Sequence, residues 1–167
     1  MGLVALSLGA AGTPQPAGPT RGIRKAYKVL GLLDDCSGRL CSTAPPGWLT
    51  SASYAAFGLA VLSHTTQHGL VMQEGGRDHT RKATEELFAA QATRLTKVPW
   101  PAYAPDVHPI AYLWKKVTKM AMHLKPFPDF TLLQAEVDKA LRHFAQTPHA
   151  IMTWMTRYCD SLGMWAA

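Results

Sequence analysis

Three short apolar segments, separated by stretches long enough for helices, constrain the fold of this chain more than any other feature. They are Ala26–Leu33, Gly69–Gln73 and Leu95–Val98, and each is bounded by turn residues. Apolar runs of this length, bounded in this way, are typical of buried strands. Strands joined through helices usually pair in parallel and carry helices on both faces of the sheet. The order therefore predicts an α/β domain.

Turn and capping residues predict where the remaining elements begin and end. After the first apolar segment, Ser37-Gly38 indicates a hairpin turn into Arg39–Thr43. For the second helix of the tail, Thr131 and Gln134 have the spacing of a capping box. The helices that we expect run from Thr50 or Ser51 to near Thr65, from Thr80 to Thr93, from Pro109 to about Leu124, from about Thr131 to Phe144, and from Thr147-Pro148 to Gly163.

Composition narrows the class of protein. The chain has 167 residues, of which 47% are apolar and 17% are charged, which is typical of one globular domain. Its three cysteines are too few for a disulfide framework, which favours a reducing compartment. A run of 18 apolar residues is absent, so we expect no membrane span. The formal net charge of +6 is compatible with a polyanionic partner.

The amino-terminal residues form a separate apolar segment. Met1–Ala11 has no Lys or Arg before its apolar run, which argues against a cleaved secretory signal. Three prolines and a glycine in Thr13–Thr20 exclude regular structure, so this loop tethers the segment to the rest of the chain. We expect Met1–Ala11 to hold an isolated strand.

The segment Tyr103–Lys116, read as YAPDVHPIAYLWKK, resembles the YSPDLNPIExLWK motif of DDE transposases of the mariner superfamily, bacterial insertion-sequence branch. Further stretches are similar to the same family in the same order: YKVLGLLDDCSGRL, SYAAF, QEGGRDHTRKA and ALRHFAQTP. The resemblance runs from about Thr20 to Gly163. It implies a ribonuclease H-like domain with a mixed sheet and flanking helices, in which three carboxylates hold two magnesium or manganese ions that cut and rejoin DNA.

The three acidic positions that the resemblance implies are poorly kept in this chain. The second acid falls on Glu74, which retains a carboxylate and so remains the one candidate metal ligand. The third acid falls on Ala111, which has no ligand atom. The first acid has no counterpart, so we expect the strand that carries it to be missing or to be replaced imperfectly by Leu3–Leu8. A two-metal site needs all three groups, so we expect an inactive transposase or endonuclease and possibly no bound metal.

A second set of candidates concerns nucleic acid. Lys115, Lys116 and Lys119 lie on or beside one face of the expected helix, and no acid intervenes between His108 and Lys125. This pattern predicts either a phosphate-contacting surface or an ordinary solvated helix face. We also include Arg77 and Tyr103 as candidate contacts with nucleic acid.

Histidines and cysteines give weaker signals. His79 matches a histidine of the family that could orient a phosphate or an acid, and a structural role is an equal alternative. His64 and His68 lie four residues apart, but no companion ligand pattern supports a metal site. Cys36 and Cys41 are expected to pack as small apolar groups.

These observations predict residues 1–19 as an apolar and proline-rich segment, 20–125 as a truncated transposase domain, and 126–167 as its helical extension. By resemblance the chain is a DNA-cutting and strand-joining domain that has lost its catalytic groups. The alternative is a non-catalytic remnant that binds nucleic acid or protein. The expected partners are DNA, a second copy or an intact transposase subunit, in the cytoplasm with the nucleoid.

Overall fold

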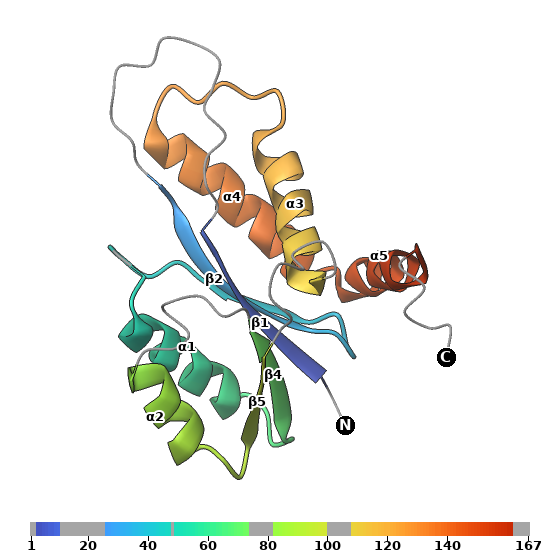
Figure 1. Ribbon diagram of the computed structural model, residues 1–167. Coiled ribbons are helices and arrows are strands. Elements are labelled where there is room, and N and C mark those ends of the chain that lie inside the picture. The colour runs from blue at the N-terminus through green and yellow to red at the C-terminus, as the bar shows by residue number, and fades with distance from the viewer. Residues whose placement is uncertain (1–2, 11–25, 48, 74–81, 100–107, 162–167) are drawn as a thin grey trace.

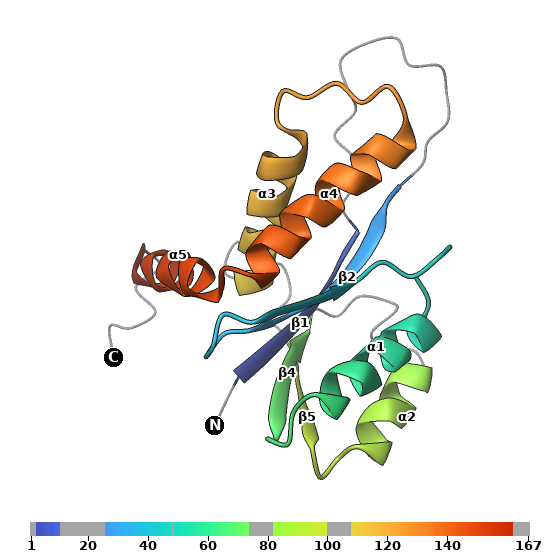
Figure 2. The ribbon, with the colours of Figure 1, turned by 180° about the vertical axis from the view of Figure 1, so that it is seen from behind.

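The computed structural model describes residues 3–10, 26–47, 49–73, 82–99 and 108–161. They form one mixed sheet with helices on both sides (Figures 1 and 2). In chain order the elements are β1 (Leu3–Ala10), β2 (Lys28–Asp34), β3 (Leu40–Thr43), α1 (Ser51–Ser63), β4 (Gly69–Gln73), α2 (Lys82–Ala90), β5 (Leu95–Pro99), α3 (Pro109–Met122), α4 (Phe130–Ala145) and α5 (Pro148–Ser161). Within the described residues, no helix is long and apolar enough to cross a membrane.

The amino-terminal strand β1 occupies the centre of the sheet. The strand order is β3-β2-β1-β4-β5, with β1 antiparallel to β2 and parallel to β4. The parallel register pairs Leu3 with Leu70 and Ala5 with Met72. The expectation of a missing first strand, or of an isolated one, is therefore wrong, and its alternative, that Leu3–Leu8 fills this position, is confirmed.

Strand β2 divides the core into two parts because both of its faces are buried. Val29 and Leu33 belong to a cluster built with α3, α4 and α5. Leu30 and Leu32 alternate with them and pack instead with side chains from α1, α2, β4 and β5. Since successive strand residues point to opposite faces, one strand supplies both clusters and fixes the three-layer arrangement.

Helix α1 begins where its capping residue predicts. The Thr50 hydroxyl accepts a hydrogen bond from the Ser53 backbone N–H, and the Ser53 hydroxyl accepts one from the Thr50 N–H. This reciprocal pair satisfies two helix-end donors. At the other end of the helix, Arg94 donates to the backbone carbonyls of Leu62 and Thr65. The two contacts tie both ends of α1 in place.

Two helix predictions need correction. The capping box at Thr131 and Gln134 is wrong, because Asp129 caps α4 by accepting from the Leu132 N–H at 2.8 Å. Asp is a strong capping residue, and Asp129 stands directly before the first residue of the helix, Phe130. The helix expected to continue to Thr93 ends at Ala90. Ala90 at this end is exposed, and the buried residues of the helix are Thr84, Leu87 and Phe88.

Candidate functional site

The first turn of α3 lies against the middle of the sheet. A Cβ placed on Gly31 of β2 would lie 2.6 Å from Trp114 Cζ2 and 3.4 Å from Ile110 Cδ1. Gly31 is paired with Ser7 of β1 across the antiparallel register. Ala111 lies between these two helix contacts in sequence and is partly buried. The position that the resemblance gives to the third acid therefore lies on a helix turn packed over β1 and β2.

The side chains in this arrangement do not fit a two-metal centre. No residue of β1 and no residue of α3 is an Asp or a Glu. Glu74, the remaining acid, lies outside the described residues, as do His79, Arg77 and Tyr103. Hard divalent cations need several oxygen ligands at one point, and one carboxylate does not supply them. We therefore derive no metal-dependent step for this chain.

Among the described residues, one cluster groups three potential metal ligands: Asp34, Asp35 and Cys36, whose ligand atoms lie within 4.8 Å of one another. Asp34 is occupied by the turn itself. Its Oδ1 accepts from the Cys36 N–H at 3.0 Å, and its Oδ2 accepts from the Ser37 hydroxyl at 2.6 Å. Asp34 is also paired with Val4, near the amino end of β1 rather than its carboxyl end. The cluster is a hairpin turn and does not replace the missing acids.

Asp35 in the same turn is electrostatically unusual. Its burial, together with the neighbouring charge of Asp34, raises the pKa of the Asp35 carboxyl to about 6, although a backbone hydrogen bond opposes the shift. The next residue, Cys36, is exposed, so the expectation that it packs as an apolar group is wrong. Cys41 is half-buried and packs against the core cluster that contains Leu30 and Leu32. The raised pKa means that the half-buried surroundings of Asp35 favour the protonated form of its carboxyl.

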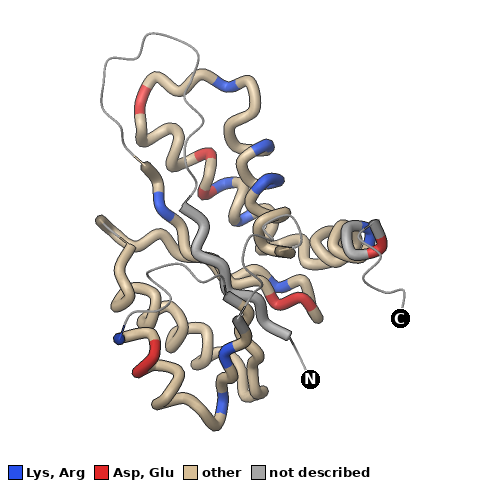
Figure 3. Tube along the Cα trace, in the orientation of Figure 1, with Lys and Arg blue, Asp and Glu red and all other residues tan. Residues whose placement is uncertain are grey.

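The lysines of α3 form the strongest charged feature. Lys115 and Lys119 are exposed, and Lys116 is half-buried between two aromatic rings. The Lys116 ammonium lies 5.1 Å from the centre of the Tyr112 ring and 5.7 Å from that of Trp154 on α5. These cation–π contacts join α3 to α5. Figure 3 shows the basic residues along α3.

Acidic groups of the neighbouring helix α4 are engaged elsewhere. Glu136 pairs with Lys125 at 2.5 Å, a contact that lowers the pKa of the Glu136 carboxyl. Asp138 accepts a hydrogen bond of 2.7 Å from the Tyr27 hydroxyl. Burial and this contact with Asp138 raise the pKa of Tyr27 to about 12. A hydrogen bond from a neutral hydroxyl cancels no charge, so of these two carboxylates Glu136 is the one paired with a cation.

Of the two histidines considered as possible metal ligands, His68 contacts neighbouring protein groups. His68 lies between the starts of β4 and β5, with Nδ1 3.0 Å from the Thr93 carbonyl oxygen and Nε2 2.8 Å from the Thr96 hydroxyl. These contacts give the ring a bridging role between the two strands. Within the described part of the chain, His64 and His68 do not belong to any group of three potential metal ligands.

Leu124 is the feature that sequence reasoning misplaced. The apolar spacing Ile110, Leu113, Val117, Met120 and Leu124 predicts one buried helical stripe, yet Met120 and Leu124 are 41% and 89% exposed. The helix ends at Met122, and Leu124 follows it with a φ of 56°, in the left-handed region. Pro126 and Pro128 are the signal that could have corrected this, since a helix usually ends shortly before such residues.

A small cavity lies under α1 and α2, far from these groups in the fold. Its volume is about 30 Å³, and its lining includes Tyr54, Val61, Leu87 and Phe88. A ligand pocket is typically about tenfold larger or more. The cavity is a packing defect of the second core cluster and offers no substrate site.

Comparison with solved structures identifies the fold. The catalytic domain of Mos1 mariner transposase superposes with a TM-score of 0.59 at 13% identity, over 95% of this chain and 81% of that domain. The catalytic core domain of BIV integrase gives 0.54 at 14% identity, over 99% and 98% of the two chains. The Mos1 strand transfer complex gives 0.58 at 14%, over 95% of this chain but 54% of the transposase.

Sequence comparison adds nothing to this result: no protein-family profile and no curated protein matches the chain. The chain spans about half of the transposase in the strand transfer complex. Structures of the Mos1 catalytic domain have been determined with manganese and with magnesium. At this level of identity, the similarity shows that the described residues have the ribonuclease H-like fold of transposase and integrase catalytic domains.

Proposed function

We propose that the chain is a degraded catalytic domain of a DDE transposase of the mariner superfamily, bacterial insertion-sequence branch, which binds nucleic acid without cutting it. The observation that supports this proposal is that the fold is present while two of its central elements have no carboxylate that could bind a metal ion. Strand β1 takes the central position of the sheet and α3 packs over it, yet neither element carries a carboxylate. The elements of the fold are therefore present, but β1 and α3 lack the carboxylates that a two-metal site would need.

Nucleic-acid binding is supported by the charge on α3. Lys115 and Lys119 are exposed, and α3 contains no acid. Losing the acid at Ala111 makes this surface more positive than an intact site would be. Each lysine that contacts a phosphate releases a counterion, which strengthens binding at low salt. We include Arg77 and Tyr103 as further contacts, and Glu74 and His79 as the remnants of the catalytic site.

The second candidate function is assembly with another protein, either a second copy or an intact transposase subunit that keeps its acids. The half-buried Trp154 and the exposed Leu132 on the tail helices favour this alternative, because apolar side chains near the surface are common at interfaces. It predicts a change in sedimentation when an intact subunit is added, with no dependence on DNA.

Binding to a labelled DNA duplex, measured at a series of salt concentrations with magnesium or with EDTA, separates these readings. We expect affinity that falls as salt rises and is indifferent to magnesium once ionic strength is matched. The variant Lys115→Gln/Lys119→Gln should lower the salt dependence. Its control is Lys82→Gln on α2, where Lys82 pairs with Glu86 at 3.6 Å. Absence of DNA binding by the folded chain would overturn the proposal, and so would magnesium-dependent nicking.

A further inference from the structure

Leu124 has two properties that folding alone disfavours. It is the one non-glycine residue with positive φ in the described part of the chain, at 56°. Its side chain is also 89% exposed, the highest value among the large exposed apolar residues. A left-handed backbone is strained for leucine, whereas glycine or asparagine adopts it readily. Strain of this kind persists where the surrounding structure enforces it and is frequent at functional sites.

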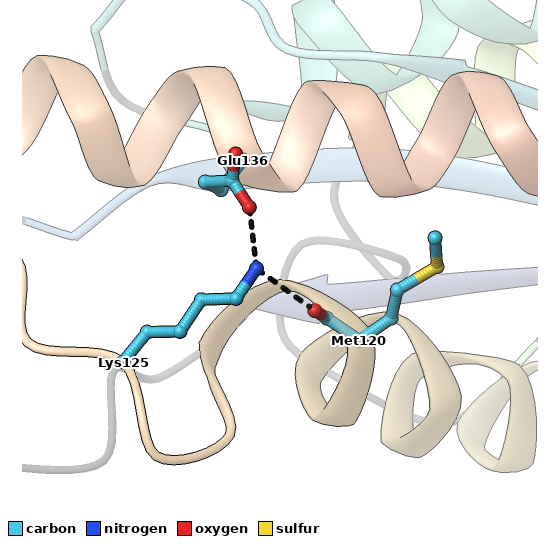
Figure 4. A network of polar contacts seen from close by, with 3 residues as sticks. All are labelled: Met120, Lys125 and Glu136. Carbon is cyan, nitrogen blue, oxygen red and sulfur yellow. Dashed lines mark hydrogen bonds and ion pairs between the residues drawn. The ribbon is translucent and has the colours of Figure 1, made fainter.

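The residues that follow Leu124 are anchored. Lys125 donates to Glu136 Oε2 of α4 at 2.5 Å and to the Met120 carbonyl of α3 at 3.5 Å (Figure 4). On the far side of Lys125, Phe127 is partly buried and packs on the core cluster beneath α3 and α4. The loop is therefore fixed to both helices, and its one strained residue presents an apolar side chain to solvent.

Other apolar and cationic groups lie in the segments that flank Leu124. Met120 and Leu132 are 41% and 48% exposed, so three of the four large exposed apolar residues in the described part of the chain belong to the end of α3, the loop after it and the start of α4. Lys119 is exposed one residue before Met120. The acids of this region are engaged, since Asp129 caps α4 and Glu136 pairs with Lys125. We call Met120, Leu124 and Leu132 the α3–α4 tip.

We propose that the α3–α4 tip engages duplex DNA, with Leu124 inserted between base pairs while the α3 lysines contact phosphates. The inference rests on the proposed nucleic-acid binding and adds its mode. Charge favours DNA over a second copy of this chain, because the adjoining helix is positive and the whole chain carries +6. An apolar side chain beside cations suits a wedge, which partly unstacks a base step and bends the duplex.

The preference for a weakened duplex tests this mode. A mismatch lowers the cost of unstacking, so the wild-type chain should bind a mismatched duplex about tenfold more tightly than the matched one at equal salt. Leu124→Gly removes the wedge and the backbone strain together. We expect this variant to lose the mismatch preference, to keep the salt dependence of binding, and to unfold at a higher temperature than wild type.

Two controls make the result specific. Leu124→Met retains a long apolar side chain and should keep the preference, whereas Leu59→Gly changes an exposed leucine, 47% exposed, on α1 across the sheet and should not affect it. A mismatch preference that survives in Leu124→Gly would overturn the wedge, as would a change in sedimentation of the free chain caused by this variant. Failure of the wild type to bind any duplex would instead overturn the proposed function, so the two failures are distinguishable.

Discussion

The two helical layers of this molecule differ in kind. On one face of the sheet, α1 contains no charged residue, and the ionic contacts of α2 are its pair with β5, Lys97 to Glu85 at 2.6 Å, and its own Lys82–Glu86 pair. On the other face, α3 carries three lysines and is followed by the strained Leu124. The first layer is explained by packing and capping alone. The second contains charge and strain that stability does not require, so function is more reasonably sought there.

The largest expected effect tests whether the two layers share the core equally. Leu30 and Leu33 are each 1% exposed or less, and they face opposite layers from the same strand. Leu30→Ala and Leu33→Ala should each lower the free energy of unfolding by about 2–5 kcal/mol, measured by chemical denaturation. A cost below ~1 kcal/mol for one of them would mean that its layer packs loosely.

Glycine-to-alanine substitutions should change the stability of the protein by different amounts in the two layers. Gly31→Ala forces a Cβ to within 2.6 Å of the Trp114 ring and should cost about 1–3 kcal/mol of stability. Gly58→Ala on α1 meets the end of the Leu87 side chain at 3.0 Å, which can shift, and it gains about 1 kcal/mol of helix propensity. We expect little net change there. Equal costs at both sites would contradict the close approach of α3 to β2.

The pH dependence of stability should report on the turn that joins β2 to β3. Because the folded pKa of Asp35 is raised to about 6, the folded state binds this proton more tightly than the unfolded chain does. Its contribution to stability is therefore most favourable below about pH 4 and is lost as the pH rises through 6. Asp35→Asn should flatten this part of the profile of unfolding free energy against pH, and an unchanged profile would show that Asp35 is solvated.

The smallest effect concerns single surface lysines. Lys119→Gln should lower the slope of log affinity for DNA against log salt by about 1 and leave thermal stability nearly unchanged. The same change at Lys97, which pairs with Glu85 on the opposite layer, should alter stability slightly and DNA binding not at all. If the Lys97 variant lowered the salt dependence of DNA binding and the Lys119 variant did not, the nucleic-acid surface would lie on the α1–α2 layer instead.

Most of the fold could be predicted because its signals are local. The apolar run of β2, the cap of α1 at Thr50 and the proline at the start of α3 each fix an element within a few residues. The central place of β1 was harder to predict, since Leu3–Ala10 pairs with strands far away in the chain and its sequence fits many partners. The end of α3 was misjudged because the apolar period continues to Leu124 after the helix has stopped.

The candidate site was predictable only in part, for a different reason. Motif similarity assigns the third acid to Ala111, and this assignment stays a prediction. The contact of Lys116 with Trp154 depends on how α5 packs. No spacing within α3 indicates a partner on α5. Likewise, the engagement of Glu136 and Asp138 by Lys125 and Tyr27 is a tertiary property. Charge could be counted from the sequence, but the pairing of Glu136 with Lys125 could not.

Titration calorimetry with Mg²⁺ and Mn²⁺, on the chain first shown to unfold cooperatively, tests the central claim most directly. We predict no specific binding of either ion by the wild type, and the same result for Glu74→Gln, because β1 and α3 supply no carboxylate. Stoichiometric binding that disappears in Glu74→Gln would contradict this claim, since other ligands would then complete a metal site with Glu74.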